Sequence, residues 1–314
     1  GDDVPEPSID GVVEVQHVRG AQARADAPAD LLLEIPHGAT RAHHFASLKG
    51  QLKGPFPENL IDFFFVNTDV GAPEAALALA RHVVARDPTR AVTLLVCQIP
   101  RTFIDCNRVI DEASRPTTST ATGMTPGVVR YVTDEGDLAL LFSKYRAYRA
   151  CITSHFEDVC GHGGTAMMFH TYAPRTVDVP VDEKIVERLH EAYRPEVEPS
   201  WPLRPEVDLI TKTPDGAVLA DAELIAGVLG SLTAAGLTVT DSNAYPLHPA
   251  SLAHTFATRW PTQTLCLEVR RDLVVQRFTP FAEMEADAAK CARIGALLGD
   301  ALLAWWQQRS GPRP

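Results

Sequence analysis

The chain has 314 residues, 45% hydrophobic and 22% charged, enough to bury a large core as one α/β domain or as two smaller domains. Its formal net charge of −11 and the lack of a sustained basic stripe argue against a nucleic-acid-binding protein. No apolar run approaches the roughly 20 residues that span a bilayer. The acidic start, GDDVPEPSIDG, lacks the order of a signal peptide, although a removed signal would leave no trace. We therefore expect a cytoplasmic protein without nucleic-acid or membrane partners, and the sequence leaves open whether it forms a homo-oligomer.

Strand and helix signals alternate along the chain. In chain order, we expect strands at 31–38, 62–69, 91–99, 165–172, 238–243 and 263–275, and helices at 72–87, 136–164, 221–237 and 280–308. Asp221 is a plausible N-cap of the third helix, and Pro280 is expected to start the fourth. The polar stretch 112–127 is expected to be a long loop that could act as a lid. The Pro-rich stretch 175–215 is expected to be irregular.

This alternation predicts a three-layer α/β/α fold built on a mixed sheet. No low-complexity linker divides the chain. We therefore expect residues 1–30 to be an N-terminal extension and residues 31–314 to be a single domain. The six cysteines are scattered and form no C-x-x-C pair, so buried free thiols are expected.

Polar residues gather where the predicted strands end, which is where α/β sheets form their ligand sites. His37 and His170 each close an apolar run. One such histidine is more often structural than a ligand, but two histidines together with the strand-end residue Asp69 favour a metal site. Neither H-E-x-x-H nor H-x-x-E occurs around them, so the spacing alone does not decide between these interpretations.

Two further strand ends carry charge. Glu268 lies in the apolar run LCLEVRR, so it either pairs with Arg270 or Arg271, or its pKa is raised by burial and it can transfer protons near neutral pH. The stretch 101–108, RTFIDCNR, either holds its own loop together through Asp105, or binds an anion through its arginines and Asn107.

Taken together and in order, six short motifs resemble the N-formylglutamate amidohydrolase family. They extend from about residue 31 to residue 275, nearly the whole chain. The motifs are IPHG at 35–38, DVGA at 69–72, RTFIDCNR at 101–108, HTYAP at 170–174, NAYP at 243–246 and LEVRRDL at 267–273. The order and spacing of the six carry the resemblance, because each motif alone is weak.

The resemblance implies a phosphorylase/hydrolase-like α/β fold shared with zinc carboxypeptidases and aspartoacylases. It implies one zinc ion, held by His37, His170 and a third ligand, for which we take Asp69, with Glu74 as the alternative. It also implies that Glu268 is the general base, with Arg101 as the second catalytic residue. The predicted substrate-binding residues are Asn107, Arg108, Tyr172, Asn243 and Arg270.

The resemblance also implies the reaction, which is hydrolysis of the amide of an N-formyl or N-acyl amino acid, and hence a small carboxylated substrate. The chain departs from the family pattern at three places near the expected pocket. The serine after His37 is missing, Thr171 stands in place of a serine, and Tyr245 and Pro246 are reversed. Two alternatives therefore remain: a hydrolase of the same mechanism acting on a specialised metabolite or peptide, and a non-catalytic protein that binds carboxylated ligands.

Overall fold

The computed structural model describes residues 5–113 and 127–310 of the chain. Most of the predicted loop at 112–127 lies outside these residues. Within them, the chain forms a seven-stranded sheet in the order β1-β3-β2-β4-β7-β5-β6. The strands are β1 (Val13–Arg19), β2 (Leu31–Ile35), β3 (Ala91–Cys97), β4 (Thr165–Tyr172), β5 (Val207–Ile210), β6 (Val239–Asp241) and β7 (Thr264–Arg270).

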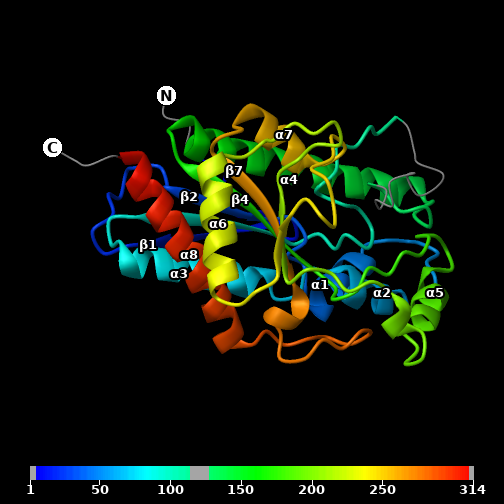
Figure 1. The fold of residues 1–314 in the computed structure, drawn as a ribbon. Helices are drawn as coiled ribbons and strands as arrows, with labels where there is room; N and C mark the ends of the chain where they lie inside the picture. The colour runs from blue at the N-terminus through cyan, green and yellow to red at the C-terminus, as the bar shows by residue number, and fades with distance from the viewer. Residues whose placement is uncertain (1–4, 114–126, 311–314) are drawn as a thin grey trace.

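The sheet is mixed. Its four central strands, β3, β2, β4 and β7, are parallel to one another, whereas β1 pairs with β3 and β5 pairs with β7 in antiparallel fashion. Helices cover both faces, which confirms the predicted three-layer α/β/α architecture (Figure 1). The helices are α1 (Ala42–Lys49), α2 (Leu60–Asn67), α3 (Ala72–Arg86), α4 (Glu135–Gly161), α5 (Ile185–Ala192), α6 (Ala222–Ala234), α7 (Leu252–Arg259) and α8 (Ala288–Ser310), with 3-10 turns at Glu198–Ser200 and Arg271–Leu273.

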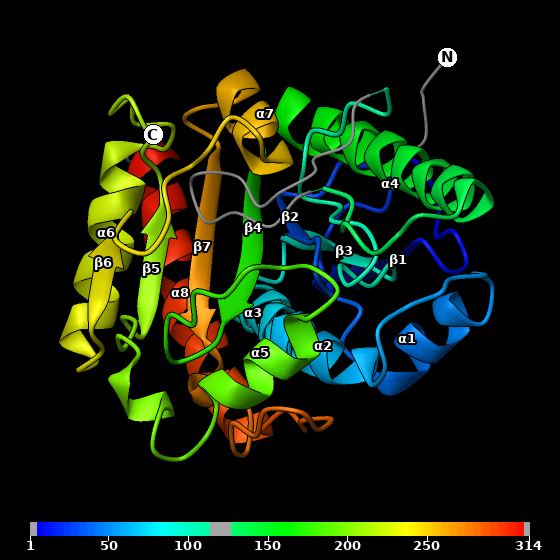
Figure 2. The same ribbon diagram turned by 90° about the vertical axis from the view of Figure 1, so that its right-hand side faces the viewer.

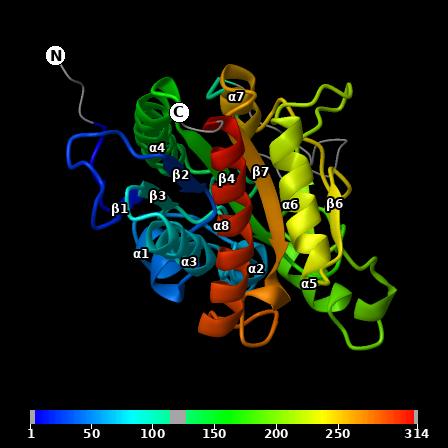
Figure 3. The ribbon, with the colours of Figure 1, turned by 60° about the vertical axis from the view of Figure 1, so that its left-hand side comes forward.

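The two faces of the sheet bury separate sets of apolar side chains. Along β4, Ala166 and Met168 face one core, while Met167 and Phe169 face the other, as the period of two in a strand requires. Helices α3, α6 and α8 pack side by side over the second core (Figure 3). Helices α4 and α7 cover the first core, which continues to α1, α2 and α5.

The carboxyl ends of the parallel strands define one edge of the sheet. From β2 the chain continues to β3 on one side and later returns to β4 on the other side, so the strand order reverses between β2 and β4. Ligands of open α/β sheets bind at such a reversal, outside the carboxyl ends of the strands. In Figure 2, α2 and α5 lie beside the carboxyl ends of β4 and β7.

The strand predicted at 62–69 is wrong, because these residues belong to helix α2. The run FFFV is rich in aromatic and β-branched residues, which favour strands. Leu60, Phe63 and Phe64 nevertheless follow the i, i+3, i+4 spacing of a helix, and all three are buried on the same helical face. The composition of so short a run does not distinguish a helix from a strand. The conformation is decided by which of its side chains the tertiary structure buries.

Two other boundaries differ from prediction. Strand β1 lies within the stretch assigned to an N-terminal extension, yet it is hydrogen-bonded to β3 along its whole length. Helix α8 begins at Ala288 rather than at Pro280. The segment between them is not helical, because the backbone of Phe281 has a positive φ of 66°. Ion pairs of Arg41 with Glu283 and Glu285 hold the segment in this conformation.

Two further expectations, for the N-cap of α6 and for the cysteines, are confirmed. Asp221 is the N-cap of α6, accepting hydrogen bonds from the backbone N–H groups of Glu223 and Leu224. All six cysteines are buried and free. Among the described residues, no helix combines the length and the apolar character that a membrane span requires.

Candidate active site

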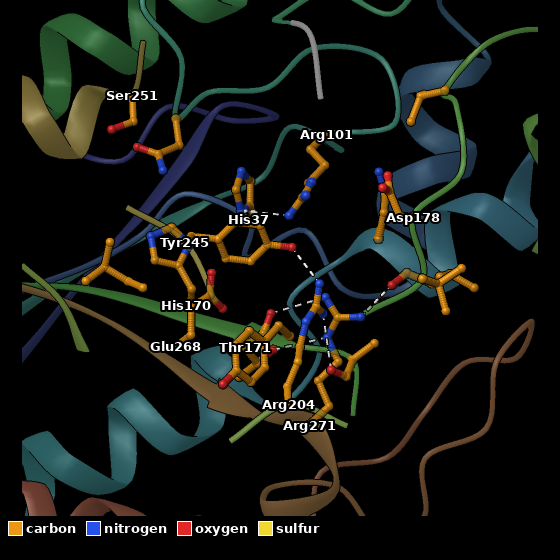
Figure 4. A pocket seen from close by; sticks show the side chains of 18 of the residues that line it. His37, Arg101, His170, Thr171, Asp178, Arg204, Tyr245, Ser251, Glu268 and Arg271 are labelled. Atoms are coloured by element: carbon orange, nitrogen blue, oxygen red, sulfur yellow. Dashed lines mark hydrogen bonds between the residues drawn. The ribbon is translucent and has the colours of Figure 1, made fainter. Parts of the chain in front are cut away.

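Two histidines and one aspartate meet at the strand ends, although they are far apart in the sequence. His37 follows β2, Asp69 connects α2 to α3, and His170 lies near the end of β4. All three side chains are buried, and one donor atom from each lies within 4.8 Å of the other two. The two imidazole rings, with centroids 5.4 Å apart, border the same pocket (Figure 4).

The distances between these donor atoms fit a metal ion. Asp69 Oδ2 lies 3.4 Å from His37 Nδ1 and 3.3 Å from His170 Nδ1. Ligands about 2.0–2.1 Å from a tetrahedral zinc ion stand about 3.3 Å from one another, by the geometry of the tetrahedron. Asp69 Oδ2 is buried and has no hydrogen-bond partner among the described residues. A cation bound at this position would compensate the lost hydration of the buried carboxylate oxygen.

Asp105 orients the first of the two histidines. Its Oδ1 atom lies 2.7 Å from His37 Nε2, so Nε2 carries the proton and Nδ1 is unprotonated. Nδ1 accepts a hydrogen bond from Arg101 Nη1 at 3.2 Å and lies 3.4 Å from Asp69 Oδ2. A carboxylate behind the far ring nitrogen is the usual outer partner of a metal-binding histidine. Burial opposes ionisation of Asp105, but the positive charge of Arg108 and the interaction with His37 hold its pKa well below the ordinary value.

Asp69 is held in the ionised form that a metal ligand needs. Burial would raise its pKa, but the neighbouring His37 and His170 lower it below the ordinary value. Burial would lower the pKa of His170, but interactions with Asp69, Cys266 and Glu268 together raise it well above the ordinary value. Behind Asp69, the buried Arg271 lies 3.5 Å from Oδ1 and donates to the carbonyl of Thr171. Arg271 therefore engages Oδ1 and leaves Oδ2 facing the histidines.

Glu268 lies beside the histidines on the next strand. Strands β4 and β7 pair in a register that places His170 opposite Glu268. Of the two alternatives from the sequence, ion pairing and a raised pKa, the structure supports the second. Arg270 binds Asp272 at 2.8 Å, and Arg271 pairs with Asp69. Burial raises the pKa of Glu268 against the opposing charge of His170, and its Oε2 atom has no hydrogen-bond partner among the described residues.

The stretch 101–108 both stabilises its own loop and lines the pocket. Asp105 Oδ1 accepts a hydrogen bond from the backbone N–H of Asn107 at 2.8 Å, and Oδ2 lies 3.6 Å from Arg108. Arg101, Asn107 and Arg108 all line the pocket, whereas Cys106 is buried in the core. Arg101 Nη1 lies 3.2 Å from His37 Nδ1 and 3.5 Å from Asp69 Oδ1. Its positive charge therefore lies beside His37, Asp69 and His170, here called the metal-ligand cluster because these residues are the candidate ligands.

Two of the predicted substrate-binding residues are not among the described residues that line the pocket. Tyr172 lines the pocket, but Arg270 and Asn243 are not among the described residues that do so. Arg270 is directed toward Asp272 and the carbonyl of Arg204. The backbone N–H of Asn243 donates to the Asp208 carboxylate.

Arg204 and Tyr245, which are not among the predicted substrate-binding residues, line the pocket instead. Arg204 donates to the hydroxyl of Tyr245 at 2.5 Å, and its guanidinium also lies against the rings of Tyr172 and Tyr245. Tyr245 is the tyrosine of the NAYP motif, so that motif contributes this side chain rather than Asn243. Arg204 lies in the irregular stretch before β5, where no strand pattern marked it.

Glu74, the alternative third ligand, lies in the first turn of α3. Its pKa is raised by burial and responds to the charges of Arg41 and Glu285. It does not belong to the set of donor atoms formed by His37, Asp69 and His170 among the described residues. The geometry therefore favours Asp69.

The Asp105–His37 contact gives a testable prediction. The Asp105→Asn variant is expected to bind zinc about 10–100-fold more weakly than the wild type, the usual cost of losing an outer carboxylate. Competition with a coloured chelator measures this affinity. Asp105 also contacts Arg108, so the Arg108→Met variant is the matched control and should keep the wild-type affinity. Equal zinc affinity in Asp105→Asn and the wild type would show that Asp105 does not support His37 as a ligand.

Comparison with solved structures places this fold among known proteins. N-formylglutamate amidohydrolase from Ralstonia eutropha superposes with a TM-score of 0.58 at 18% identity, over 96% of this chain and 99% of that chain. A gene product from Agrobacterium tumefaciens superposes with a TM-score of 0.52 at 18% identity, over 94% and 96% of the two chains. An aspartoacylase family protein from Mesorhizobium loti reaches a TM-score of only 0.34 at 13% identity, over 95% and 71% of the two chains, too low to establish a shared fold.

At this level of identity, the first two likenesses establish the fold. The chain shares the α/β fold of the Ralstonia N-formylglutamate amidohydrolase, and the resemblance seen in the sequence motifs is confirmed to that extent. No protein-family model matches the sequence, and no curated protein is significantly similar to it.

Proposed function

We propose that this protein is a zinc-dependent amidohydrolase that cleaves the amide bond of an N-acyl amino acid. The observation that carries the proposal is the convergence of the buried side chains of His37, His170 and Asp69, in which Asp69 Oδ2 lies 3.4 Å from His37 Nδ1 and 3.3 Å from His170 Nδ1. The chemistry of this set supports zinc, which binds imidazole and carboxylate and leaves a position open in catalytic sites. The pocket has a volume of about 250 Å³, which fits a small molecule rather than a polypeptide chain.

When bound, zinc would polarise the amide carbonyl and lower the pKa of an attacking water toward neutrality. Glu268 would accept the proton of that water and return it to the nitrogen of the leaving amine. Its raised pKa supports this role, because a base is most effective when its pKa lies near the working pH. Arg101, beside His37 and Asp69, is placed to stabilise the negative charge that develops on the carbonyl oxygen.

The carboxylate of the substrate would bind at the 101–108 loop. Asn107 accepts a hydrogen bond from the backbone N–H of Ala253 through its Oδ1 atom, so its amide NH₂ group remains to donate to a ligand. Arg108 lies beside it and lines the same pocket. Together these side chains present N–H donors and a positive charge to a carboxylate. Holding the substrate at this end would orient its amide bond relative to Glu268.

Hydrolysis of a panel of N-formyl, N-acetyl and longer N-acyl amino acids, with and without zinc, tests the proposal. Zinc-loaded protein is expected to release the free amino acid, detected by amine-reactive fluorescence. Treatment with a chelator should abolish release, and added zinc should restore it. A protein that binds the panel members but gains no activity with stoichiometric zinc would instead be a non-catalytic binder, and the proposal would be rejected.

A further inference from the structure

The pocket continues beyond the metal-ligand cluster into an apolar region, here called the apolar arm. The arm comprises Phe63 and Val66 of α2, the three valines Val177, Val179 and Val181, and Leu189 of α5, all of which line the same pocket as His37 and His170. The three valines are each partly buried, whereas Asp178 and Pro180 between them in the sequence VDVPV are exposed. Asp178 also lines the pocket, next to the valines in the sequence.

The apolar arm is fixed relative to the metal-ligand cluster by a buried arginine. Arg271 donates through Nη1 to the carbonyl of Val66 and through Nη2 to the carbonyl of Thr171, while the same guanidinium lies 3.5 Å from Asp69 Oδ1. Helix α2 also contacts α5, the other helix of the arm. One side chain therefore connects a metal ligand to the wall of the arm, so the two parts of the pocket have a defined relative position.

The apolar arm and the proposed carboxylate site lie on different sides of the metal-ligand cluster. Asn107 is anchored at the start of α7, because its carbonyl accepts from the N–H of Leu252, the residue after Ser251. The exposed Asp178 belongs to the valine segment of the arm. In Figure 4, Ser251 and Asp178 lie on opposite sides of His37. A substrate held by its carboxylate near Asn107 would therefore direct its acyl group toward the arm.

We propose that the apolar arm binds the acyl group of the substrate, and that this acyl group is an apolar chain or ring of several carbons rather than a formyl group. This inference rests on the proposed amidohydrolase function and specifies its substrate class. A formyl group has a single hydrogen beyond its carbonyl and would leave the walls of the arm uncovered. An acyl chain would remove apolar surface of both ligand and arm from water, which is the dominant favourable contribution to binding in such a pocket.

A series of acyl groups on one amino acid tests the inference. The zinc-loaded protein would be assayed with formyl, acetyl, butanoyl, hexanoyl and phenylacetyl derivatives of the amino acid preferred in the panel. The value of kcat/KM is expected to rise about fourfold for each added methylene until the arm is filled. A flat series, or a preference for formyl, would overturn the inference and leave the amidohydrolase proposal intact. The inference would also be overturned if kcat/KM depended on the side chain of the amino acid but not on the acyl chain.

A substitution in the arm provides the second measurement. In Val179→Asp, the ratio of kcat/KM for hexanoyl over formyl substrate should fall about tenfold or more, since a charged group opposes the transfer of an apolar chain into the arm. Val179 is only partly buried, so the change should be tolerated by the fold. The matched control is Val218→Asp, at an exposed valine that does not line the pocket, and its ratio should equal that of the wild type.

Binding to metal-free protein separates this inference from the proposed function. Isothermal titration calorimetry is expected to give tighter binding for the hexanoyl than for the formyl derivative, and this preference should be lost in Val179→Asp. If zinc-loaded protein hydrolysed no member of the series, the proposed function would fail, while this binding preference would still support the arm. Equal affinities for the hexanoyl and formyl derivatives would refute the arm as an acyl site.

Discussion

Replacing His37 or His170 by alanine is expected to give a folded protein that no longer retains zinc and has lost its amidohydrolase activity. Each substitution removes one of the two imidazole nitrogens that lie 3.4 Å (His37) and 3.3 Å (His170) from Asp69 Oδ2, the third candidate donor atom. Loss of an outer partner alone already costs about 10–100-fold in metal affinity, so loss of a direct ligand should cost at least about 100-fold. Elemental analysis of the purified proteins measures zinc content, and circular dichroism verifies the fold.

The matched control is His162→Ala, because His162 is an exposed histidine after α4 and does not line the pocket. It should retain zinc as the wild type does. The same analysis decides the third ligand, since Asp69→Asn should lose zinc and Glu74→Gln should keep it. Equal zinc content in the wild type and in both histidine variants would show that the site at His37 and His170 does not hold the metal.

The fold was predictable where hydrophobic pattern and tertiary burial agree. The apolar runs at β2, β4 and β7 end in the polar residues His37, His170 and Glu268, and this pattern is sufficient to place these residues at one edge of a parallel sheet. The pattern was insufficient for α2, where a short aromatic run forms a buried helix. The hydrophobic pattern also did not indicate that β1 would join the sheet by pairing with β3, which lies some 70 residues later in the chain.

The candidate site was predictable only for side chains whose position follows from a strand end. Arg270 and Arg271 are adjacent, and the sequence favoured Arg270 as a substrate-binding residue. The backbone enters a 3-10 turn at Arg271, which ends the strict alternation of the strand and directs Arg271 toward Asp69. Arg204 comes from an irregular segment, where periodicity carries no information about side-chain direction. The side-chain positions of Arg204 and Arg271 depend on contacts between segments that are distant in the sequence, and no local sequence pattern encodes such contacts.

Replacing Glu268 by glutamine is expected to lower kcat by about 10²–10⁴ while zinc content stays at the wild-type level. Glutamine keeps the size and hydrogen-bonding capacity of the side chain but cannot accept the proton of the attacking water. Zinc should remain, because Glu268 is not one of the three converging donors. Steady-state kinetics with the best N-acyl amino acid, together with elemental analysis, gives both quantities. Glu223→Gln, an exposed change in the first turn of α6, is the matched control.

The pH dependence of the reaction distinguishes a general base from a buried acid that only supports the fold. Burial raises the pKa of Glu268, and the ionised form is the active one, so wild-type kcat should fall as the pH drops through that raised value. The residual activity of Glu268→Gln should lack this acidic limb. If Glu268 acts only in the transition state, kcat and kcat/KM should fall by the same factor, whereas a change in KM alone would indicate a role in substrate binding. Full activity in the glutamine variant would exclude Glu268 as the base and require another proton acceptor in the pocket.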